Sequence, residues 1–467
     1  MKPGTAVIRA LSKADADKYA DFNLTVESAS RPPEPERPDS SSSSSSSDAG
    51  SYKPSEPAKP AEPSVKVENG KIAVQAKREQ GSTVAKAVIT AEALDQALKD
   101  AQPDNRGVKK VRIEVAADKE ATGVDVSMSA AALTGSGLQQ QYEMVTPQAI
   151  VTVPSNMISK DAAKDAKTIS IVIGQSDRGS WPAALSAKVG ERPAVTVELK
   201  ADGKPLSGMR AGAPMLVAIP YKPTARELAL SHSIIIWAVD TSGRSVAVPS
   251  AKYDAATGIV RFETMQLGTY AVGFNIKEFA DTGKLDWAKV SIEALAARGI
   301  IDGVDENRFA PQLDITRGDF TVMLVRALGL QASGGGSARS GADSGFADVN
   351  ADAYYAEVVG MAKELGFVQG KGDNAFGPRD AISRQDMFTM VARALEKTGM
   401  LKVDGDSDAL AAYTDSAQVS DYAKGSLAGL LQEGLLQGSR SKLHPDSRAT
   451  RAEVAVFLNR VHNRVYE

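Results

Sequence analysis

Three arginines recur at a fixed interval near the C-terminal end of the chain. Arg317, Arg384 and Arg451 lie 67 residues apart, in the stretches ITRGDF, ISRQDM and ATRAEV. Each stands in the first turn of a predicted helix, where the helix dipole disfavours a cation. A guanidinium beside the free N–H groups of a helix N-terminus can bind a carboxylate with two hydrogen bonds. The pattern predicts three anion sites; the alternative is that each arginine pairs with an acid of the protein, such as Asp281 or its counterparts.

The residues that flank each arginine have the pattern of a helix N-cap. In this pattern a hydroxyl and, three residues later, a carboxylate satisfy free backbone N–H groups, which is worth about 1 kcal/mol. The pairs are Thr316 and Asp319, Ser383 and Asp386, and Thr450 and Glu453. We expect capping to be their main role and sugar contacts to be secondary. Gly318 costs about 1 kcal/mol of helix propensity and makes the first copy the least regular.

Other residues recur in register with the arginines. Each copy opens with an aromatic residue, an aspartate two positions later and then a second aromatic. The aspartates are Asp281, Asp348 and Asp415, the second aromatics are Trp287, Tyr354 and Tyr422, and a loop glycine recurs at Gly303, Gly370 and Gly438. The second aromatics either pack in the core or line a groove in which sugar rings stack. The glycines predict turns and places where a ligand approaches the backbone closely.

A repeat of helix, loop and helix must position these side chains. Apolar residues at helical spacing follow each second aromatic and end at Gly299, Gly366 or Gly434, which fit helix C-caps. The helix after each arginine has one apolar face. Because one copy is too small to bury its own core, we expect residues 276–330, 343–397 and 410–467 to form one all-α domain with approximate threefold symmetry.

The repeat resembles the S-layer homology (SLH) module, which occurs in triplets at the ends of bacterial surface proteins. The resemblance rests on the aromatic-x-Asp opening, the Trp/Tyr–Ala pair, the Gly–Ile/Leu turn and the ITRAE-type helix start, over about 190 residues. It implies a pseudo-trimer that binds secondary cell wall polysaccharide, often through a pyruvylated sugar, in grooves between modules. It also implies that the arginines, second aromatics, acids and loop glycines above are the polysaccharide-binding residues. The first two copies read TRGD and SRQD instead of TRAE, so the resemblance predicts the fold for all three but not equal use of the grooves.

The chain upstream of the repeat has three compositions. Residues 1–27 alternate like two strands and resemble the tail of a bacterial Ig-like domain. Residues 28–64 are rich in Pro, Ser, Glu and Lys, which predicts a disordered linker. Residues 65–275 contain short β-branched runs between turns, with one helix at Thr90–Ala101, and predict one or two antiparallel sandwich-like modules. The last part resembles a β domain found upstream of wall-anchoring repeats in Gram-positive surface proteins. The predicted fold is multidomain, a β-rich region followed by the all-α triplet.

Composition excludes several kinds of chemistry. The chain has no cysteine, which excludes disulfides and thiolate sites, and its net charge of −3 without a basic domain argues against nucleic acid as a partner. It has no apolar run of the roughly 18 residues that a membrane span needs. Asp404–Asp415 lacks the glycine and glutamate of a calcium loop, and His232 has no Ser–His–Asp order around it. We therefore expect no metal, no cofactor and no catalytic residue.

Two functions follow from these observations. The leading hypothesis is a non-enzymatic protein anchored to the bacterial cell wall, whose β-rich region is a spacer or self-associates in an S-layer. The alternative is a wall-anchored, polysaccharide-acting enzyme whose catalytic part is the β-rich region or lies upstream. We expect a cell-surface location. Because residues 1–27 resemble only the tail of a domain, we expect the sequence to be truncated, which would also explain why the first residues lack the apolar core of a signal peptide.

Overall fold

The computed structural model describes residues 4–11, 19–26, 65–135, 137, 139–207, 209–210, 212–330, 344–403 and 405–466. The predicted linker at 28–64 lies outside the described residues. Strands β1 (Gly4–Leu11) and β2 (Tyr19–Val26) pair antiparallel within a separate unit of the chain. Their membership of an Ig-like domain, like the other domain assignments, stays a prediction.

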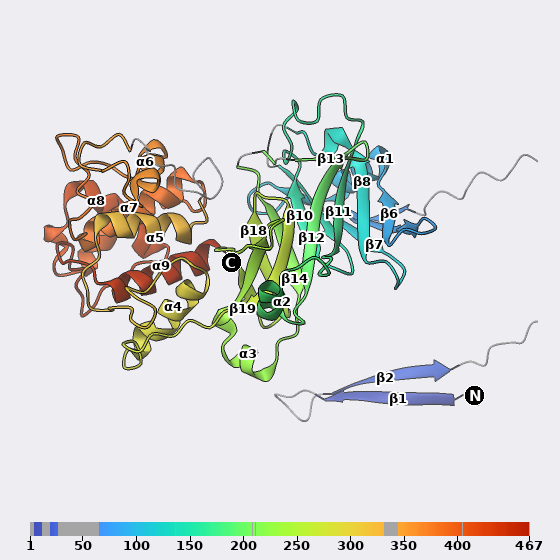
Figure 1. The fold of residues 1–467 in the computed structure, drawn as a ribbon, viewed down its shortest axis with the longest axis horizontal. Coiled ribbons are helices and arrows are strands. Elements are labelled where there is room, and N and C mark those ends of the chain that lie inside the picture. The colour runs from blue at the N-terminus through green and yellow to red at the C-terminus, as the bar shows by residue number, and fades with distance from the viewer. Residues whose placement is uncertain are drawn as a thin grey trace, which may run out of the picture. The chain divides into compact units, whose positions relative to one another are not determined.

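Residues 65–275 form two mixed β-sheets that share one apolar core (Figure 1). Ile113 and Val151 of the first sheet and Val126 and Ile171 of the second are fully buried in it. The first sheet has the order β17 (Lys252–Asp254), β18 (Ile259–Thr264), β14 (Met215–Pro220), β10 (Ile150–Pro154), β9 (Gln140–Val145), β7 (Lys109–Ala116), β4 (Lys71–Gln75), β3 (Val65–Glu68). The second has the order β16 (Ser245–Ala247), β15 (Ile234–Val239), β19 (Gly268–Phe274), β12 (Ala194–Ala201), β11 (Thr168–Gln175), β8 (Gly123–Ser129), β6 (Val84–Val88), β5 (Lys77–Arg78), with β13 (Lys204–Leu206) paired to β12.

The expectation of purely antiparallel sheets is wrong. β4 pairs parallel to β7, β7 to β9, and β6 to β8. The chain alternates between the two sheets from β4 to β9, so strands that return to one sheet run in the same direction. Alternation of apolar residues shows which side of a strand is buried, but it does not show the direction of the neighbouring strand.

The β-rich region also has more helix than predicted. α1 (Ala91–Asp100) confirms the predicted helix, with the Thr90 side chain as its N-cap. Two short helices, α2 (Ala183–Val189) and α3 (Ala225–Ala229), were not predicted, because five to seven residues give little periodic signal. Short 3₁₀ turns lie at Ala130–Ala132, Ser231–Ser233, Ser407–Ala412 and Ser416–Gln418.

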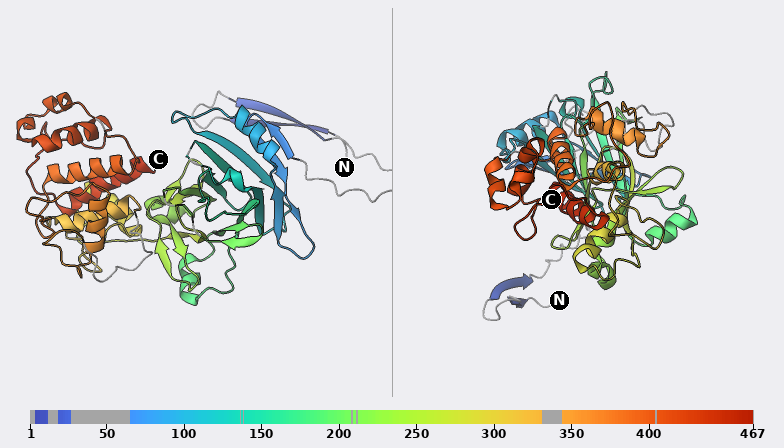
Figure 2. Two further views of the ribbon diagram at one scale, coloured as in Figure 1. Left: turned by 90° about the horizontal axis from the view of Figure 1, so that it is seen from above. Right: turned by 90° about the vertical axis from the view of Figure 1, so that its left-hand side faces the viewer.

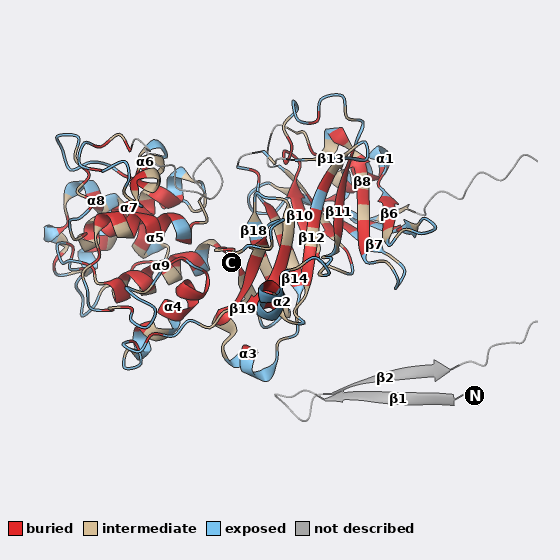
Figure 3. Cartoon of the chain, in the orientation of Figure 1, coloured by how far each residue is buried: buried red, intermediate tan, exposed pale blue. Residues whose placement is uncertain are grey.

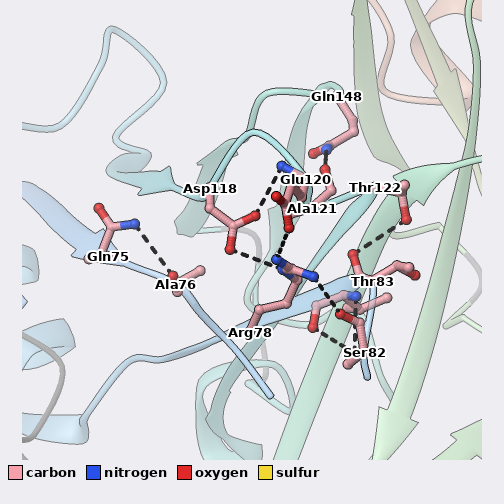
Figure 4. A network of polar contacts seen from close by, with 11 residues as sticks. Gln75, Ala76, Arg78, Ser82, Thr83, Asp118, Glu120, Ala121, Thr122 and Gln148 are labelled. Atoms are coloured by element: carbon pink, nitrogen blue, oxygen red, sulfur yellow. Dashed lines mark hydrogen bonds and ion pairs between the residues drawn. The ribbon is translucent and has the colours of Figure 1, made fainter. Parts of the chain in front are cut away.

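A polar network lies at the β5 edge of the second sheet (Figure 4). Arg78 on β5 donates hydrogen bonds to Asp118 at 3.0 Å, to the carbonyl oxygen of Ser82 at 3.3 Å and to Glu120. The network links the β5–β6 hairpin to the β7–β8 loop, and it places charged side chains at an edge that would otherwise offer unpaired backbone groups.

Six helices lie in the described part of residues 276–467, and the second helix of each repeat begins at a motif arginine. They are α4 (Asp286–Ala297), α5 (Arg317–Ala327), α6 (Ala356–Glu364), α7 (Arg384–Lys397), α8 (Asp421–Gln432) and α9 (Arg451–Val465). α5 packs on α6, α7 on α8 and α9 on α4, so each repeat contacts the next and the last contacts the first. All three repeats share one apolar core, and Figure 3 shows α5 and α9 as largely buried. Among the described residues, no helix combines the length and apolarity that crossing a membrane requires.

A closed ring of backbone hydrogen bonds joins the three repeats just before the arginines. The amide of Ile315 donates to Ala449, that of Ala449 to Ile382, and that of Ile382 back to Ile315, at 3.0, 3.1 and 3.0 Å. This cycle gives the triplet its approximate threefold arrangement. The C-cap prediction is also confirmed, since Gly299, Gly366 and Gly434 have φ angles of 67°, 81° and 69°.

The ends of α4 and α9 are fixed to the β-rich region, whose place beside the helices is seen in Figure 2. Arg298, buried at the end of α4, donates to the carbonyl oxygens of Ala251 and His232, each at 2.8 Å. Nε2 of His462 on α9 lies 2.7 Å from the carbonyl oxygen of Pro249. Burial lowers the pKa of Arg298 to about 10 and that of His462 to about 3.

Candidate functional site: the three module boundaries

Each motif arginine extends from its own helix into the loop of the next repeat. Arg317 shows the pattern: Nε donates to the carbonyl oxygen of Phe376 at 2.9 Å and Nη2 to that of Gln369 at 3.3 Å. Nε of Arg384 donates to Leu443 at 3.1 Å, and Arg451 donates to Phe309 at 2.9 Å and Asp302 at 2.6 Å. Burial lowers the pKa of all three guanidinium groups, yet arginine stays charged. The arginines therefore join the modules and hold a positive charge at each boundary.

Two of the arginines also pair with acids, though not with those considered from the sequence. Nη1 of Arg317 lies 3.2 Å from Oδ2 of Asp386, and Nη1 of Arg384 lies 3.3 Å from Oε1 of Glu453. Both acids lie in the cap of the following module. In the described residues, no ion pair joins an arginine of the motif to Asp281 or its counterparts, so that alternative is wrong about the partner.

The opening aspartates instead hold the loops. Each carboxylate accepts two consecutive backbone N–H groups: Asp281 from Phe309 and Ala310, Asp348 from Phe376 and Gly377, and Asp415 from Leu443 and His444, at 2.7–3.1 Å. Burial alone would raise the pKa of Asp348 and Asp415, but the donated N–H bonds outweigh it and lower both. These aspartates fix the carbonyl groups that receive the arginines.

The loop glycines are required for space. A Cβ on Gly303 would lie 2.6 Å from the ring of Phe279, and one on Gly438 would lie 2.2 Å from the ring of Tyr413. The same holds for Gly370 at 3.1 Å. Each ring is the aromatic that opens its module, so the glycine permits close packing of ring against loop.

The second aromatics lie at the surface rather than in the core. Trp287, Tyr354 and Tyr422 retain 55%, 63% and 51% of their exposure. The hydroxyl of Tyr422 donates to Oδ1 of Asp386 at 2.7 Å, and that of Tyr354 donates to Asp319. Burial and then the hydrogen bond to Asp386 raise the pKa of Tyr422 to about 12. Their positions fit the groove-edge alternative.

The predicted caps form at all three helix starts, with one difference. Thr316, Ser383 and Thr450 each accept a hydrogen bond from the backbone N–H three residues later, at 3.1–3.3 Å. Only Glu453 completes the reciprocal capping box, by accepting from the amide of Thr450 at 2.9 Å. Aspartate in the other two copies is one methylene shorter.

One feature of the first boundary was missed in the sequence. In the second repeat the residue after the exposed ring is Tyr355, where the other repeats have alanine. A Cβ on Gly318 would lie 3.2 Å from Cδ1 of Tyr355, so the glycine leaves room for this ring. The extra tyrosine in FADVNADAYYA was the available signal. A hollow of about 560 Å³ adjoins Tyr355, and Asp348 and Lys371 are among its lining residues.

A guanidinium, a carboxylate and an exposed aromatic ring from three different modules thus come together in Arg317, Asp386 and Tyr422, and again in Arg451, Asp319 and Tyr354. This set suits the binding of an anionic sugar, through charge-assisted hydrogen bonds and ring stacking. Across the described residues there is no cluster of three side chains of the metal-binding types.

Comparison with known protein families identifies the three repeats. The model of the S-layer homology domain matches residues 278–321, 345–388 and 412–455. The C-terminal region consists of three SLH domains. These domains imply anchoring to the cell wall and indicate a cell-surface, wall-associated location.

Relatives of the chain carry different names. They include an amylopullulanase of Thermoanaerobacterium thermosulfurigenes, 31% identical over 44% of this chain and 11% of that protein. Exoglucanase XynX of Acetivibrio thermocellus is 30% identical over 38% of this chain and 15% of that protein. The surface-layer 125 kDa protein of Lysinibacillus sphaericus is 28% identical over 37% and 14%, respectively. The chain therefore spans less than a sixth of each of these relatives.

Proposed function

We propose that the protein is a non-enzymatic wall anchor whose SLH domains bind a secondary cell wall polysaccharide through the carboxylate of a pyruvylated sugar. The observation that carries this proposal is the guanidinium held at a helix N-terminus beside an exposed aromatic ring. Asp386, which pairs with Arg317, also accepts the hydroxyl of exposed Tyr422. Likewise Asp319, whose charge acts on Arg451, accepts the hydroxyl of exposed Tyr354.

The surroundings of the arginines favour a carboxylate ligand. The guanidinium groups are oriented in advance by the loop carbonyls, so binding costs little ordering of the side chain. Arg317 and Arg451 retain only 5% and 8% of their exposure, and charges interact more strongly where water is excluded. A polymer that presents the same sugar repeatedly would engage more than one boundary, which raises the overall affinity through effective concentration.

The test is cosedimentation of the full chain with purified cell-wall sacculi. We expect wild-type protein to sediment with native sacculi and to stay in solution after mild acid has removed ketal-linked pyruvate from the polymer. Variants with glutamine at all three arginines should lose binding. Sedimentation that survives loss of the pyruvate or of the arginines would contradict the proposal.

A second candidate is a wall-anchored enzyme that acts on polysaccharides. It is favoured by the relatives named amylopullulanase and exoglucanase. The β-rich region has a buried carboxylate in Glu227, but its contacts are structural. Glu227 completes a capping box with Thr224 and pairs with Arg192 at 2.7 Å. Release of reducing sugar from starch, cellulose or xylan by the chain would favour the enzyme. We further propose that the β-rich region is a spacer or an S-layer-forming module. Measuring the particle size of the protein over a range of concentrations would distinguish the two, because a self-associating module forms larger particles as the concentration rises.

A further inference from the structure

The first and third SLH domains contact the β-rich region through polar side chains, and we call this contact the joint. Nε and Nη1 of Arg298, at the end of α4, donate to the carbonyl oxygens of Ala251 and His232, each at 2.8 Å. From the other side, Nδ2 of Asn275 donates to the carbonyl oxygen of Ala297 at 2.7 Å. Hydrogen bonds in both directions therefore hold the end of α4 against the β-rich region.

Arg298 belongs to the joint rather than to the repeat. Counted from the exposed aromatic of each module, it corresponds to Leu365, which is 38% exposed, and to Glu433, which is half-buried. Arg298 itself is only 7% exposed, and its guanidinium donates to carbonyl oxygens of the β-rich region. Since the other two modules fold with a leucine or a glutamate here, the arginine serves the contact with the β-rich region.

His462 on α9 also departs from the repeat. Counted from the motif arginine, it corresponds to Leu328 of the first module and Leu395 of the second, and none of the three is more than 2% exposed. Nε2 of His462 lies 2.7 Å from the carbonyl oxygen of Pro249, which can only accept, so Nε2 carries the proton. An imidazole thus replaces a buried leucine, and its hydrogen bond crosses to the β-rich region.

The surroundings of His462 disfavour a second proton on the ring. The charges that act on it are those of Arg298 and Lys252, both cations. The ring of Tyr466 packs against it with centroids 4.9 Å apart, and the charge of Glu263 acts on the Tyr466 phenol. Burial is the main cause that lowers the pKa of His462 to about 3, and the two cations lower it further. The intact joint therefore holds a neutral imidazole.

A second histidine of the joint responds in the same direction. Nε2 of His232 lies 3.4 Å from Oε2 of Glu293, a carboxylate that is 3% exposed and also pairs with Lys289. Burial lowers the pKa of His232; the charge of Glu293 opposes this shift, whereas Arg298 and Lys289 add to it. Both histidines of the joint thus take up protons more readily once water reaches them.

We propose that the joint is acid-sensitive: it holds the β-rich region and the SLH triplet as one rigid body near neutral pH and releases them from each other as the pH falls towards 5. Separation exposes His462 to water, where an imidazole takes up a proton at about pH 6.5. Because the separated form then binds the extra proton, each pH unit below this value favours separation by up to about tenfold. The joint works independently of what the triplet binds.

The test is a distance measurement between two spin labels on the full chain, by pulsed electron paramagnetic resonance. The chain has no cysteine, so Lys119→Cys in the β-rich region and Glu396→Cys at the end of α7, both exposed, place one label on each side of the joint. We expect one narrow distance distribution at pH 7.5 and a broad one at pH 5. The ratio of docked to separated protein should fall about thirtyfold over this range through His462 alone. Far-UV circular dichroism should stay unchanged.

Three variants in the labelled chain assign the effect. His462→Leu installs the leucine of the other modules and should reduce the pH-dependent change in that ratio at least about tenfold; His462→Gln, which can still donate to Pro249, replaces it if the leucine variant does not fold. His444→Asn is the matched control, because His444 is the histidine outside the joint, is exposed and has a φ angle of 53°, which asparagine tolerates. Arg298→Leu should broaden the distribution already at pH 7.5.

Every outcome decides for or against the acid-sensitive joint. A narrow distribution that persists at pH 5 would overturn it, and so would a pH response that survives the loss of His462 or disappears in His444→Asn. Loss of the far-UV signal at the same pH as the change in distance would also overturn it, since the triplet would then unfold rather than separate. None of these results bears on binding of the wall polysaccharide, which the sacculi test decides.

Discussion

Gly318 and Tyr355 are expected to be energetically coupled across the first module boundary. The Cβ of an alanine at 318 would lie 3.0 Å from the carbonyl oxygen of Pro378 and 3.2 Å from the ring of Tyr355. The close approach to the carbonyl oxygen is not expected to be costly. At the same position of the other copies, Gln385 and Ala452 donate their amide N–H to the matching proline carbonyl at 2.9 and 3.1 Å, although both carry a Cβ. The ring is what differs between the copies.

The two single variants should both be destabilising, and the double variant should show the coupling. Gly318→Ala gains up to about 1 kcal/mol of helix propensity and loses about 1–3 kcal/mol to overpacking, so we expect a net destabilisation of about 1 kcal/mol. Tyr355→Ala removes a half-buried ring and should cost about 2 kcal/mol, roughly half the value for a fully buried aromatic. In the double variant the alanine has room, so its helix propensity is realised. We expect the double variant to be about 1–2 kcal/mol more stable than the sum of the single effects.

The assay is urea unfolding of the full chain, followed by far-UV circular dichroism at 222 nm, to which the six helices contribute strongly. The four proteins of the cycle are compared through the transition of the helical region. Additivity within about 0.3–0.5 kcal/mol would show that the two residues do not interact and would refute this account of Gly318.

Three further predictions concern stability. The pKa of His462 is about 3 in the folded protein and 6.5 in the unfolded chain, so between these pH values the unfolded chain binds one more proton. The free energy of unfolding should therefore fall by up to about 1.4 kcal/mol per pH unit as the pH drops from 6.5 to 3. Urea unfolding at several pH values should show a weaker pH dependence for His462→Gln. Gly438→Ala should destabilise the protein by about 1–3 kcal/mol, because the added Cβ would meet the ring of Tyr413. The control Gly425→Ala on α8 has open space around its Cβ and should stabilise the protein by about 0.5–1 kcal/mol. Equal melting temperatures for the two variants would argue against the packing role of Gly438. Asp348→Asn should lower the free energy of unfolding by about 1–2 kcal/mol. Because the pKa of Asp348 is lowered in the folded protein, the difference in stability between wild type and variant should disappear as the pH falls below about 4. A difference that stays constant down to pH 2 would contradict the role of the Asp348 carboxylate as an acceptor of loop N–H groups.

Local features of the repeat were predictable from the sequence. The helix starts at Thr316, Ser383 and Thr450 and the C-terminal glycines follow from short-range rules of capping and periodicity. The resemblance to the SLH module, which the family comparison confirms, implied a pseudo-trimer, and the packing of the helices shows this arrangement.

Contacts between modules were not predictable in the same way. Arg317 and Asp386 are 69 residues apart, and their pairing depends on the ring formed by all three modules. The first-turn arginine looked unsatisfied because its partners, the carbonyl groups of Phe376 and Gln369, belong to another repeat. The parallel pairing of β4 with β7 has the same origin, since it depends on how the chain crosses between sheets.

The central claim is that the SLH domains recognise a carboxylate on the wall polysaccharide through their motif arginines. The most direct measurement is the affinity of the full chain for purified wall polymer, determined by calorimetry before and after removal of the ketal-linked pyruvate. We expect the affinity to fall at least about a hundredfold when the carboxylate is lost. Equal affinity for the two polymers would contradict it.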